Sequence, residues 1–347
     1  MKSYFKKHTL KFKQASGTSR GVLHDKETWL IWIEDKGKTG IGECGLLRGL
    51  SCDDLPDYEE KLEWTCSNIS LGEEVLHAEL VNYPSIQMGI ETAFLSLKGK
   101  TPFTLYENPF SEGEDEIPIN GLVWMGDKFF MLKQIEEKLE AGFSCIKMKV
   151  GAIDFDEEIR LLQAIRSRFS SDEITLRVDA NGAFGEDALD KLNQLAPLEI
   201  HSIEQPIKKG NFSKMRDLCR HSPIPIALDE ELIGVTSKDR KIQLLEQIQP
   251  QYIILKPSFI GGFRGANEWL SLSSQMGIES WVTSALESNI GLNAIAQWTY
   301  AMGFSGPQGL GTGSLYTNNF PSPLLIKNGY LSIEKNTLWT PLQKIVS

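Results

Sequence analysis

Six charged side chains stand at the ends of short apolar runs in the middle of this chain. The runs end at Lys147 and Lys149, Asp179, Glu204, Asp229 and Lys256, and the three acidic positions recur every 25 residues. Strand-then-helix units of a barrel repeat at about that interval, and barrel enzymes gather their chemistry at the carboxyl ends of the strands. The spacing therefore predicts an enzyme whose reactive groups converge on one face of a barrel.

The three acids Asp179, Glu204 and Asp229 would project from three successive strands. Neighbouring strands lie roughly 4.8 Å apart, so three such carboxylates can share one small cation. An all-oxygen set prefers a hard ion, which predicts Mg²⁺, with Mn²⁺ as the alternative, rather than zinc. Because residues 229 to 231 are all acidic, either Asp229 or Glu230 can be the third ligand.

The positions of the lysines in the sequence indicate proton transfer. Lys147 and Lys149 are two residues apart and would share one face of a strand. Lys256 would approach from the opposite side of the barrel. We expect the ammonium form of a lysine beside a second lysine and a metal to be disfavoured, which suits a general base. A metal with opposed lysines favours removal of a proton next to a carboxylate, through an enediolate intermediate.

The surrounding sequence predicts the elements that hold these groups. Residues 5–45 have the pattern of β structure with a hairpin, and residues 58–98 have a helical pattern. From about residue 116, eight strand candidates alternate with helical segments. The predicted fold class is α/β, a (β/α)8 TIM-type barrel with an N-terminal α+β capping domain. We place the cap at 1–112, the barrel at 113–313, and a tail that packs back on the cap at 314–347.

The sequence also predicts where the barrel strands lie. The first spans 117–124, and later ones end at the charged residues already named. The last two lie near 279–283 and 308–310.

The charged motifs as a set resemble the enolase superfamily, in its muconate-lactonising-enzyme-like branch. The matching segments are Lys147-Met-Lys149, Asp179-Ala-Asn181, Glu204-Gln-Pro206, Asp229-Glu230 and Lys256-Pro257. The resemblance covers nearly the whole chain. It implies that Lys149 and Lys256 form the acid/base pair with support from Lys147, and that Asp179, Glu204 and Asp229 bind Mg²⁺. The choice of Asp229 over Glu230 rests on this resemblance.

Within the superfamily, three further segments are similar to the o-succinylbenzoate synthase family. They are residues 42–50, 284–288 and 309–316. The resemblance implies a lyase of menaquinone biosynthesis that dehydrates 2-succinyl-6-hydroxy-2,4-cyclohexadiene-1-carboxylate to 2-succinylbenzoate. It implies substrate contacts for Arg177, Asn181, Ser284, Gly311 and Thr312. Glu231 departs from the pattern, because relatives often carry serine there.

Rival interpretations use the same residues. An N-succinylamino-acid racemase or a dipeptide epimerase would remove a proton with one lysine and return one with the other. The segment Gly309-Leu-Gly-Thr-Gly313 lacks the acids that dipeptide epimerases carry, which disfavours the epimerase. A non-catalytic barrel that binds a carboxylate would be expected to lack one of these groups.

Composition limits which partners and which cellular compartment are expected. The net charge of −10 disfavours nucleic acid as a partner. The expected partner is a small-molecule carboxylate substrate, which the lysine and metal chemistry indicates. Five scattered cysteines without a CxxC pair disfavour a disulfide framework. With no apolar run long enough for a signal peptide or a membrane span, we expect a cytoplasmic protein that does not enter the membrane.

Overall fold

The computed structural model describes residues 1–18, 21–151 and 153–346. Its first part contains an antiparallel sheet in the order β1-β2-β3, formed by β1 (Lys2–Thr18), β2 (Gly21–Asp35) and β3 (Lys38–Cys44). Strands β2 and β3 meet in a tight turn at Lys36 and Gly37, whose φ angles of 48° and 81° match the right-handed twist of a hairpin. The predicted hairpin is confirmed.

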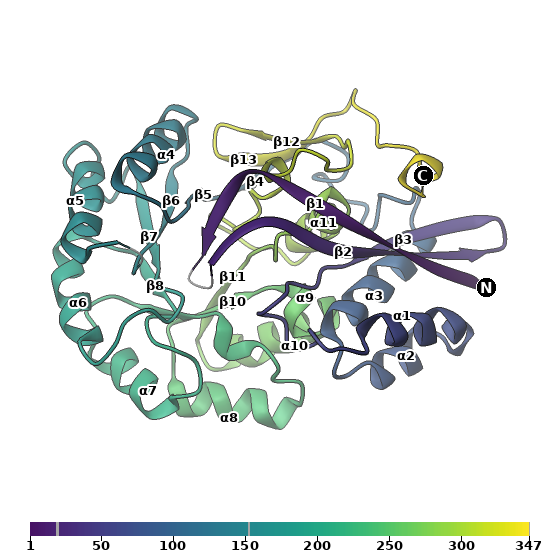
Figure 1. Ribbon diagram of the computed structural model, residues 1–347, viewed down its shortest axis with the longest axis horizontal. Helices are drawn as coiled ribbons and strands as arrows, with labels where there is room; N and C mark the ends of the chain where they lie inside the picture. The colour runs from purple at the N-terminus through teal and green to yellow at the C-terminus, as the bar shows by residue number, and fades with distance from the viewer. Residues whose placement is uncertain (19–20, 152, 347) are drawn as a thin grey trace.

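Helices pack on one face of this sheet. They are α1 (Tyr58–Ser67), the 3₁₀ turn η1 (Ile69–Leu71), α2 (Glu73–Glu79) and α3 (Pro84–Lys98). Helix α3 lies very close to β3. A Cβ atom at Gly42 of β3 would be only 2.0 Å from the carbonyl oxygen of Gly89 in α3. The apolar side of α3 is buried against Trp29 and Ile31 of β2. This sheet-and-helix unit is the cap (Figure 1).

The second part is a curved parallel sheet of seven strands in sequence order. The strands are β5 (Gly121–Val123), β6 (Cys145–Lys149), β7 (Thr175–Asp179), β8 (Ser202–Glu204), β9 (Ile226–Leu228), β10 (Tyr252–Leu255) and β11 (Glu279–Val282). Two isolated parallel bridges, Thr283 to Gly309 and Ile119 to Gln308, connect the two edges of the sheet. The predicted TIM-type barrel with an N-terminal cap is confirmed.

Helices surround this sheet, as Figure 1 shows for its left-hand side. They are α4 (Lys128–Glu140), α5 (Phe155–Arg166), α6 (Ala188–Leu195), α7 (Phe212–His221), α8 (Lys238–Ile248), α9 (Pro257–Ile260), α10 (Gly262–Gln275) and α11 (Asn289–Ala301). Short 3₁₀ turns complete the set: η2 (Ala196–Leu198), η3 (Glu230–Leu232) and η4 (Gly313–Leu315). Side-chain caps at Asp127, Asp154 and Ser288 accept backbone N–H groups and set where their helices begin.

The predicted first strand over 117–124 is wrong as a single element. The chain forms β4 (Ile117–Pro118), which pairs antiparallel with β13 (Tyr330–Ile333), and only then enters the barrel as β5. Proline has no N–H to donate, so Pro118 does not continue a central strand. The predicted strand near 308–310 is present only as the two bridges at Gln308 and Gly309.

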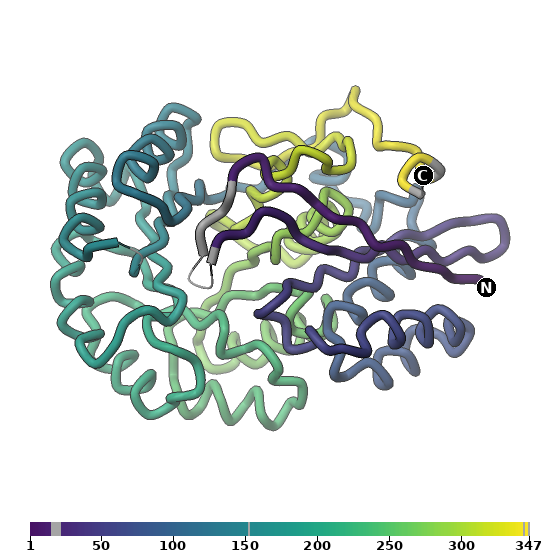
Figure 2. The backbone as a smooth tube through the Cα atoms, viewed as in Figure 1, coloured from purple at the N-terminus to yellow at the C-terminus, as the bar shows by residue number. Residues whose placement is uncertain are grey.

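The C-terminal segment returns to the cap. Strand β12 (Leu324–Lys327) forms a hairpin with β13, and α12 (Leu342–Val346) follows. Phe320 and Ile345 pack with Trp32 and Ile41 of the cap sheet. Figure 2 shows both chain ends on the same side of the molecule. Among the described residues, no helix is both long and apolar enough to cross a membrane.

Candidate active site

The predicted charged groups meet at the carboxyl ends of the barrel strands. Strand β6 alternates, so Ile146 and Met148 enter the apolar core while Lys147 and Lys149 face inward. The register pairs Lys149 with Asp179 and Asp179 with Glu204, which places these groups at one level of the barrel. All three carboxylates, Asp179, Glu204 and Asp229, are buried, at 1 to 2% exposure.

Lysine ammonium groups bind these carboxylates directly. The Lys147 Nζ lies 3.0 Å from Asp179 Oδ2 and also donates to Glu204 Oε2. The Lys149 Nζ donates to Asp179 Oδ2 at 2.9 Å and to Asn181 Oδ1 at 2.6 Å. From the other side, Lys256 donates to Asp229 and lies 3.9 Å from Glu204 Oε1. Three lysines thus balance the formal charge of three buried acids.

These contacts shift the pKa values in the site. Burial lowers the pKa of Lys147, but Asp179 and Glu204 together outweigh it, so the pKa lies above its ordinary value. Lys256 behaves in the same way beside Asp229 and Glu204. In the metal-free site the nearby carboxylates therefore favour the charged form of these two lysines, and the prediction for a lysine beside a bound metal stays a prediction. Burial and the charge of Asp179 raise the pKa of Glu204 to about 7.

Left-handed backbone turns position the polar groups beside the lysines. Asn181 has a φ of 43°, and its side chain accepts from Lys149 and donates to Glu230 Oε1 at 3.1 Å. Gln205 has a φ of 42°, and its Oε1 accepts the backbone N–H of Asp229. These turns fix the first residues after β7 and β8.

The consecutive acids after β9 have different partners. Asp229 binds Lys256 and Glu230 binds Asn181, so both face the site. Glu231 instead accepts the backbone N–H of Gly210 at 3.0 Å. Glu231, which departs from the family pattern, therefore contacts a loop outside the lysine and carboxylate cluster.

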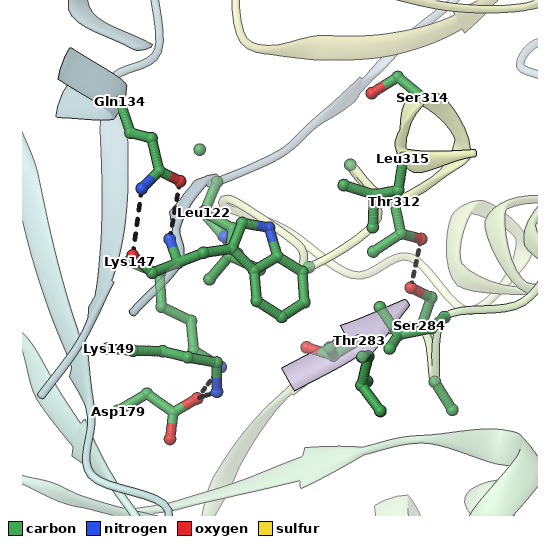
Figure 3. Close-up of a pocket in the computed structure, with 18 of the residues that line it drawn as sticks. Leu122, Gln134, Lys147, Lys149, Asp179, Thr283, Ser284, Thr312, Ser314 and Leu315 are labelled. Atoms are coloured by element: carbon green, nitrogen blue, oxygen red, sulfur yellow. Dashed lines mark hydrogen bonds and ion pairs between the residues drawn. The ribbon is translucent and has the colours of Figure 1, made fainter. Parts of the chain in front are cut away.

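A cavity of about 480 Å³ opens at this site. Lys147, Lys149, Asp179 and Lys256 contribute to its walls. The substrate-contact candidates Asn181, Ser284, Gly311 and Thr312 line the same cavity. Ser284 Oγ and Thr312 Oγ1 share a hydrogen bond of 2.6 Å and lie across the cavity from Lys149 and Asp179, as Figure 3 shows.

Arg177 is the one predicted substrate contact that the structure does not place along this cavity. Its guanidinium lies 4.2 Å from the centre of the Trp281 ring and donates to the carbonyl oxygen of Pro307 at 2.8 Å. Arg177 lies two residues before the end of β7, where it pairs with Lys147, and its side chain meets Pro307 instead of the cavity.

The carboxylates are of the type that binds Mg²⁺, although their side chains as placed do not form a metal site. Among residues 1–18, 21–151 and 153–346, no three acidic, histidine or cysteine side chains gather closely enough to hold a metal as placed. The lysines separate them. The donors are nonetheless all oxygen, and the buried Glu204 Oε1 has no hydrogen-bond partner within the described chain. The residues therefore fit a hard divalent cation.

Several functional neighbours were not identified from the sequence. Trp124 and Gln134 line the cavity, and the Gln134 amide binds both the N–H and the C=O of Trp124, at 2.9 and 3.1 Å. Leu47 and Leu50 of the cap, which belong to the 42–50 segment already noted in the sequence, also line it. No motif marks Trp124 and Gln134, because each reaches the site through the packing of one element on another.

Comparisons with known proteins agree with this geometry. The family model for the enolase C-terminal domain-like fold matches residues 131–337. The chain is 41% identical to o-succinylbenzoate synthase of Desulfotalea psychrophila, over 96% of this chain and 99% of that protein. It is 27% identical to o-succinylbenzoate synthase of Bacillus subtilis, over 87% of this chain and 83% of that protein.

A solved structure shows the same similarity in three dimensions. The crystal structure of MenC from Desulfotalea psychrophila superposes with a TM-score of 0.85 at 39% identity, and it covers 96% of this chain and 99% of its own. Members of this superfamily use Mg²⁺. On the strength of the family model and of the close full-length relative, the chain belongs to the o-succinylbenzoate synthase family, lyases of the enolase superfamily.

Proposed function

We propose that this chain dehydrates 2-succinyl-6-hydroxy-2,4-cyclohexadiene-1-carboxylate to 2-succinylbenzoate in menaquinone biosynthesis. The observation that carries the proposal is the placement of Lys149, at the end of β6, and Lys256, directly after β10, along one cavity. These strands lie four positions apart in the sheet order, so the two amino groups reach a bound ring from opposite sides.

Lys149 is the proposed base. Its Nζ is held between Asp179 Oδ2 and Asn181 Oδ1, both within hydrogen-bond distance, so the nitrogen has a fixed position at the cavity wall. As the neutral amine it takes the proton next to the ring carboxylate and leaves an enediolate. The resulting ammonium then delivers the proton to the departing hydroxyl. The C–O bond breaks, water leaves, and the ring becomes aromatic.

Lys256 is the proposed electrostatic partner. As an ammonium group it faces the developing negative charge of the enediolate from the other side of the ring. Its Nζ donates to Asp229 and lies 3.9 Å from Glu204 Oε1, which sets its position at this wall of the cavity. Charge stabilisation in a buried site is a large contribution to catalysis.

Asp179, Glu204 and Asp229 are the proposed ligands of Mg²⁺, with Mn²⁺ as an alternative ion. A bound divalent cation supplies positive charge where the substrate carboxylate gains electrons. Lys147 then acts as a positioning residue, because it contacts Asp179 and Glu204 together. Ser284, Thr312, Gly311 and Asn181 are proposed to bind the polar groups of the substrate, whereas Arg177 supports the wall behind them.

A second candidate activity uses the same pair of lysines. Because Lys149 and Lys256 lie on opposite sides of one cavity, one can remove an α-proton and the other can return it. An N-succinylamino-acid racemase is therefore the alternative. The segment 309–313 presents Leu310, which is fully buried, and no carboxylate, so a dipeptide ammonium group lacks a counter-charge there.

The test follows the loss of the cyclohexadiene absorbance. Wild-type protein with Mg²⁺ is expected to convert the substrate at a kcat/KM of about 10⁴ M⁻¹s⁻¹ or more, and EDTA is expected to stop the reaction. Lys149→Ala should slow it by roughly 10² to 10⁴-fold, the usual contribution of a positioned base. Lys133→Ala, on the exposed face of α4, is the matched control and should leave the rate unchanged.

The alternative outcome is equally clear. A folded protein with bound metal that leaves the cyclohexadiene unchanged would overturn the dehydratase proposal. Exchange of the α-proton of an N-succinylamino acid in D₂O would then identify the racemase.

A further inference from the structure

Glu287 is a buried carboxylate that the proposed chemistry does not use. It follows β11, is fully buried, and lies behind the wall of the catalytic cavity rather than along it. Its Oε1 accepts the hydroxyl of Ser258 at 2.5 Å, and its Oε2 accepts the backbone N–H of Ala285 at 2.6 Å. This carboxylate therefore joins the chain after β10 to the chain after β11.

The contact with Ser258 holds the turn that carries Lys256. Lys256 directly precedes α9, and its carbonyl oxygen accepts the backbone N–H of Phe259 at 2.8 Å. Ser258 lies in this short helix and is fully buried. Because α9 is a single turn, the bond from Ser258 to Glu287 helps to set where the turn lies. The direction in which the Lys256 side chain enters the cavity depends on that turn.

The contact with Ala285 holds the segment that carries Ser284. Ser284, Ala285 and Leu286 all line the cavity. Leu286 has a φ of 63°, a left-handed conformation that costs free energy for any residue except glycine. Such a conformation persists only where surrounding contacts hold it. The bond from the Ala285 N–H to Glu287 is one of these contacts, and the bond from Tyr316 Oη to Leu286 O, at 2.7 Å, is another.

The cap adds a second carboxylate to the same junction. Glu43 of β3 is 1% exposed, and it accepts the backbone N–H groups of Ser288 and Gly291, at 2.9 and 2.8 Å, where α11 begins. The cap backbone also lies against Glu287 itself, because a Cβ atom at Gly45 would be 3.0 Å from the Cγ of Glu287. The cap therefore packs directly on the residue that joins the two cavity segments.

Lys26 is the cation of this junction. It belongs to β2 of the cap, is 2% exposed, and its Nζ has no hydrogen-bond partner within the described chain. Burial lowers the pKa of Lys26, and the charges of Glu43 and Glu287 oppose that change. Burial raises the pKa of Glu287, and the charge of Lys26 opposes that change in turn. A buried charge is costly without a counter-charge, so the ammonium favours the ionised form of Glu287.

We propose that Glu287 is a positioning residue for the reaction. Its carboxylate holds the segments that carry Lys256 and Ser284 in one arrangement, and Lys26 of the cap supplies its counter-charge. The proposal rests on the proposed function, because Lys256 and Ser284 take their roles from it. A displacement of a reacting group by about 1 Å can slow a reaction roughly 10²-fold, so a group that fixes both segments affects the rate without touching the substrate.

Ser258→Ala tests the contact with the Lys256 turn alone. It removes the hydroxyl and leaves the Ala285 contact in place. With Mg²⁺ present, we expect kcat to fall about tenfold, the factor that a hydrogen bond to a charged group represents, while KM stays the same. Ser273→Ala removes an equally buried hydroxyl from α10 and is the matched control, which should change neither constant. An unchanged kcat in Ser258→Ala would overturn the proposal.

Glu287→Ala removes both contacts. We expect a lower kcat and a higher KM, with a loss of roughly 10²-fold in kcat/KM. Adding Ser258→Ala should lower kcat no further, because the hydroxyl no longer has a carboxylate to bind. Losses that multiply in the double variant would show that the two residues act independently and would overturn the proposal.

Glu91→Ala is the matched control for a lost carboxylate. Glu91 also accepts backbone N–H groups across the boundary between cap and barrel, but it does so at α10. Its loss should lower the Tm and leave kcat and KM of the folded protein unchanged. A loss of kcat/KM as large as that of Glu287→Ala would assign the effect to stability of the boundary and overturn the positioning role.

The counter-charge is tested by compensation. Lys26→Met leaves two buried carboxylates without their cation, and we expect a lower Tm and a fall of about tenfold in kcat/KM. Adding Glu287→Gln removes one negative charge, while the glutamine amide can still accept from Ala285 and donate to Ser258. The double variant should regain most of the Tm and of kcat/KM. A double variant that folds where Lys26→Met does not counts as the same recovery, and no recovery would overturn the role of Lys26.

The positioning role and the proposed function fail in different ways. Wild-type protein that turns over the cyclohexadiene while Ser258→Ala keeps its full kcat removes the positioning role and keeps the proposed function. Wild-type protein that does not turn over the cyclohexadiene removes the proposed function, and with it the reaction that Glu287 would serve.

Discussion

The ammonium of Lys147 lies 3.0 Å from Asp179 Oδ2, and both side chains are almost completely buried. The same ammonium also binds Glu204, so one lysine from β6 joins acids from β7 and β8. In the metal-free protein this lysine supplies charge that the buried acids need. Its removal therefore tests how much of the stability of the site depends on counter-charge.

Lys147→Met is expected to destabilise the metal-free protein by roughly 3 to 5 kcal/mol, the usual result of breaking a buried ion pair. Lys98→Met is the matched control, because Lys98 pairs with Glu73 at the same 3.0 Å on the surface. That exposed pair should contribute about 1 kcal/mol or less. Urea denaturation of both variants in EDTA measures the difference, and equal losses would contradict the prediction.

The buried carboxyl group of Glu204 is expected to make the stability of the metal-free protein depend on pH. Burial, together with the charges of Asp179 and Asp229, raises its pKa to about 7 in the folded state, from an ordinary value of 4.5. The proton is bound more tightly in the folded state. The stabilising contribution is therefore complete below about pH 4.5 and is lost as the pH rises through about 7.

We expect the Tm of the metal-free protein to fall between pH 5.5 and pH 8 for this reason. Glu204→Gln should reduce that fall, because glutamine does not ionise. Thermal denaturation in EDTA across this range provides the measurement. An identical pH profile in the variant would show that another group is responsible.

Metal binding is predicted to release protons. Neighbouring carboxylates hold the pKa values of Lys147 and Lys256 above their ordinary values against the effect of burial. A divalent cation among the same carboxylates removes that support, and it also favours the ionised form of Glu204. Calorimetric titration with Mg²⁺ in two buffers of different ionisation enthalpy should show proton release and tighter binding as the pH rises from 6 to 8. Proton uptake, or affinity independent of pH, would contradict this account.

The cap and the barrel are joined through Glu91. This residue of α3 accepts the backbone N–H groups of Phe263 and Arg264, at 2.6 and 3.1 Å, in the first turn of α10. Burial raises the pKa of Glu91 to about 7. A raised pKa means that the ionised carboxylate is disfavoured in the folded state, so its stabilising contribution falls as the pH rises from about 4.5 through 7.

Glu91→Gln keeps one acceptor oxygen and removes the charge. We expect the variant to gain stability relative to wild type as the pH rises from 5 to 8, measured as the difference in Tm at each pH. Glu63→Gln, on exposed α1 of the same cap, is the control for a lost surface charge. A difference in Tm that stays constant with pH would contradict the assignment.

Ser284 and Thr312 are predicted to act on substrate binding. Their hydroxyl groups bind each other at 2.6 Å in the cavity wall opposite Lys149. Hydrogen bonds to charged groups contribute about 1.5 to 3 kcal/mol, so Ser284→Ala is expected to raise KM about tenfold or more. Thr299→Val, buried in α11 away from the cavity, controls for the loss of an internal hydroxyl. A drop in kcat with an unchanged KM would instead place Ser284 in the chemical step.

The sequence by itself determined which charged residues gather at the site and the class of fold. Asp179, Glu204 and Lys256 each follow a short apolar run, and that local pattern is enough to place a residue at a strand end. The regular spacing of those runs indicates a repeating strand and helix unit, and a parallel repeat closes most readily as a barrel. Each of these signals lies within about thirty residues of chain, so no long-range contact had to be known.

The tertiary structure decided the partners of those residues. Arg177 contacts Pro307, 130 residues away, and so does not reach the cavity. The ammonium of Lys147 spans two acids because three strands lie in one register. The barrel closes beside β5 through only two isolated bridges, and Gln134 of α4 binds the backbone of Trp124 there. Such contacts depend on how distant segments pack, and periodicity along the chain carries no information about them.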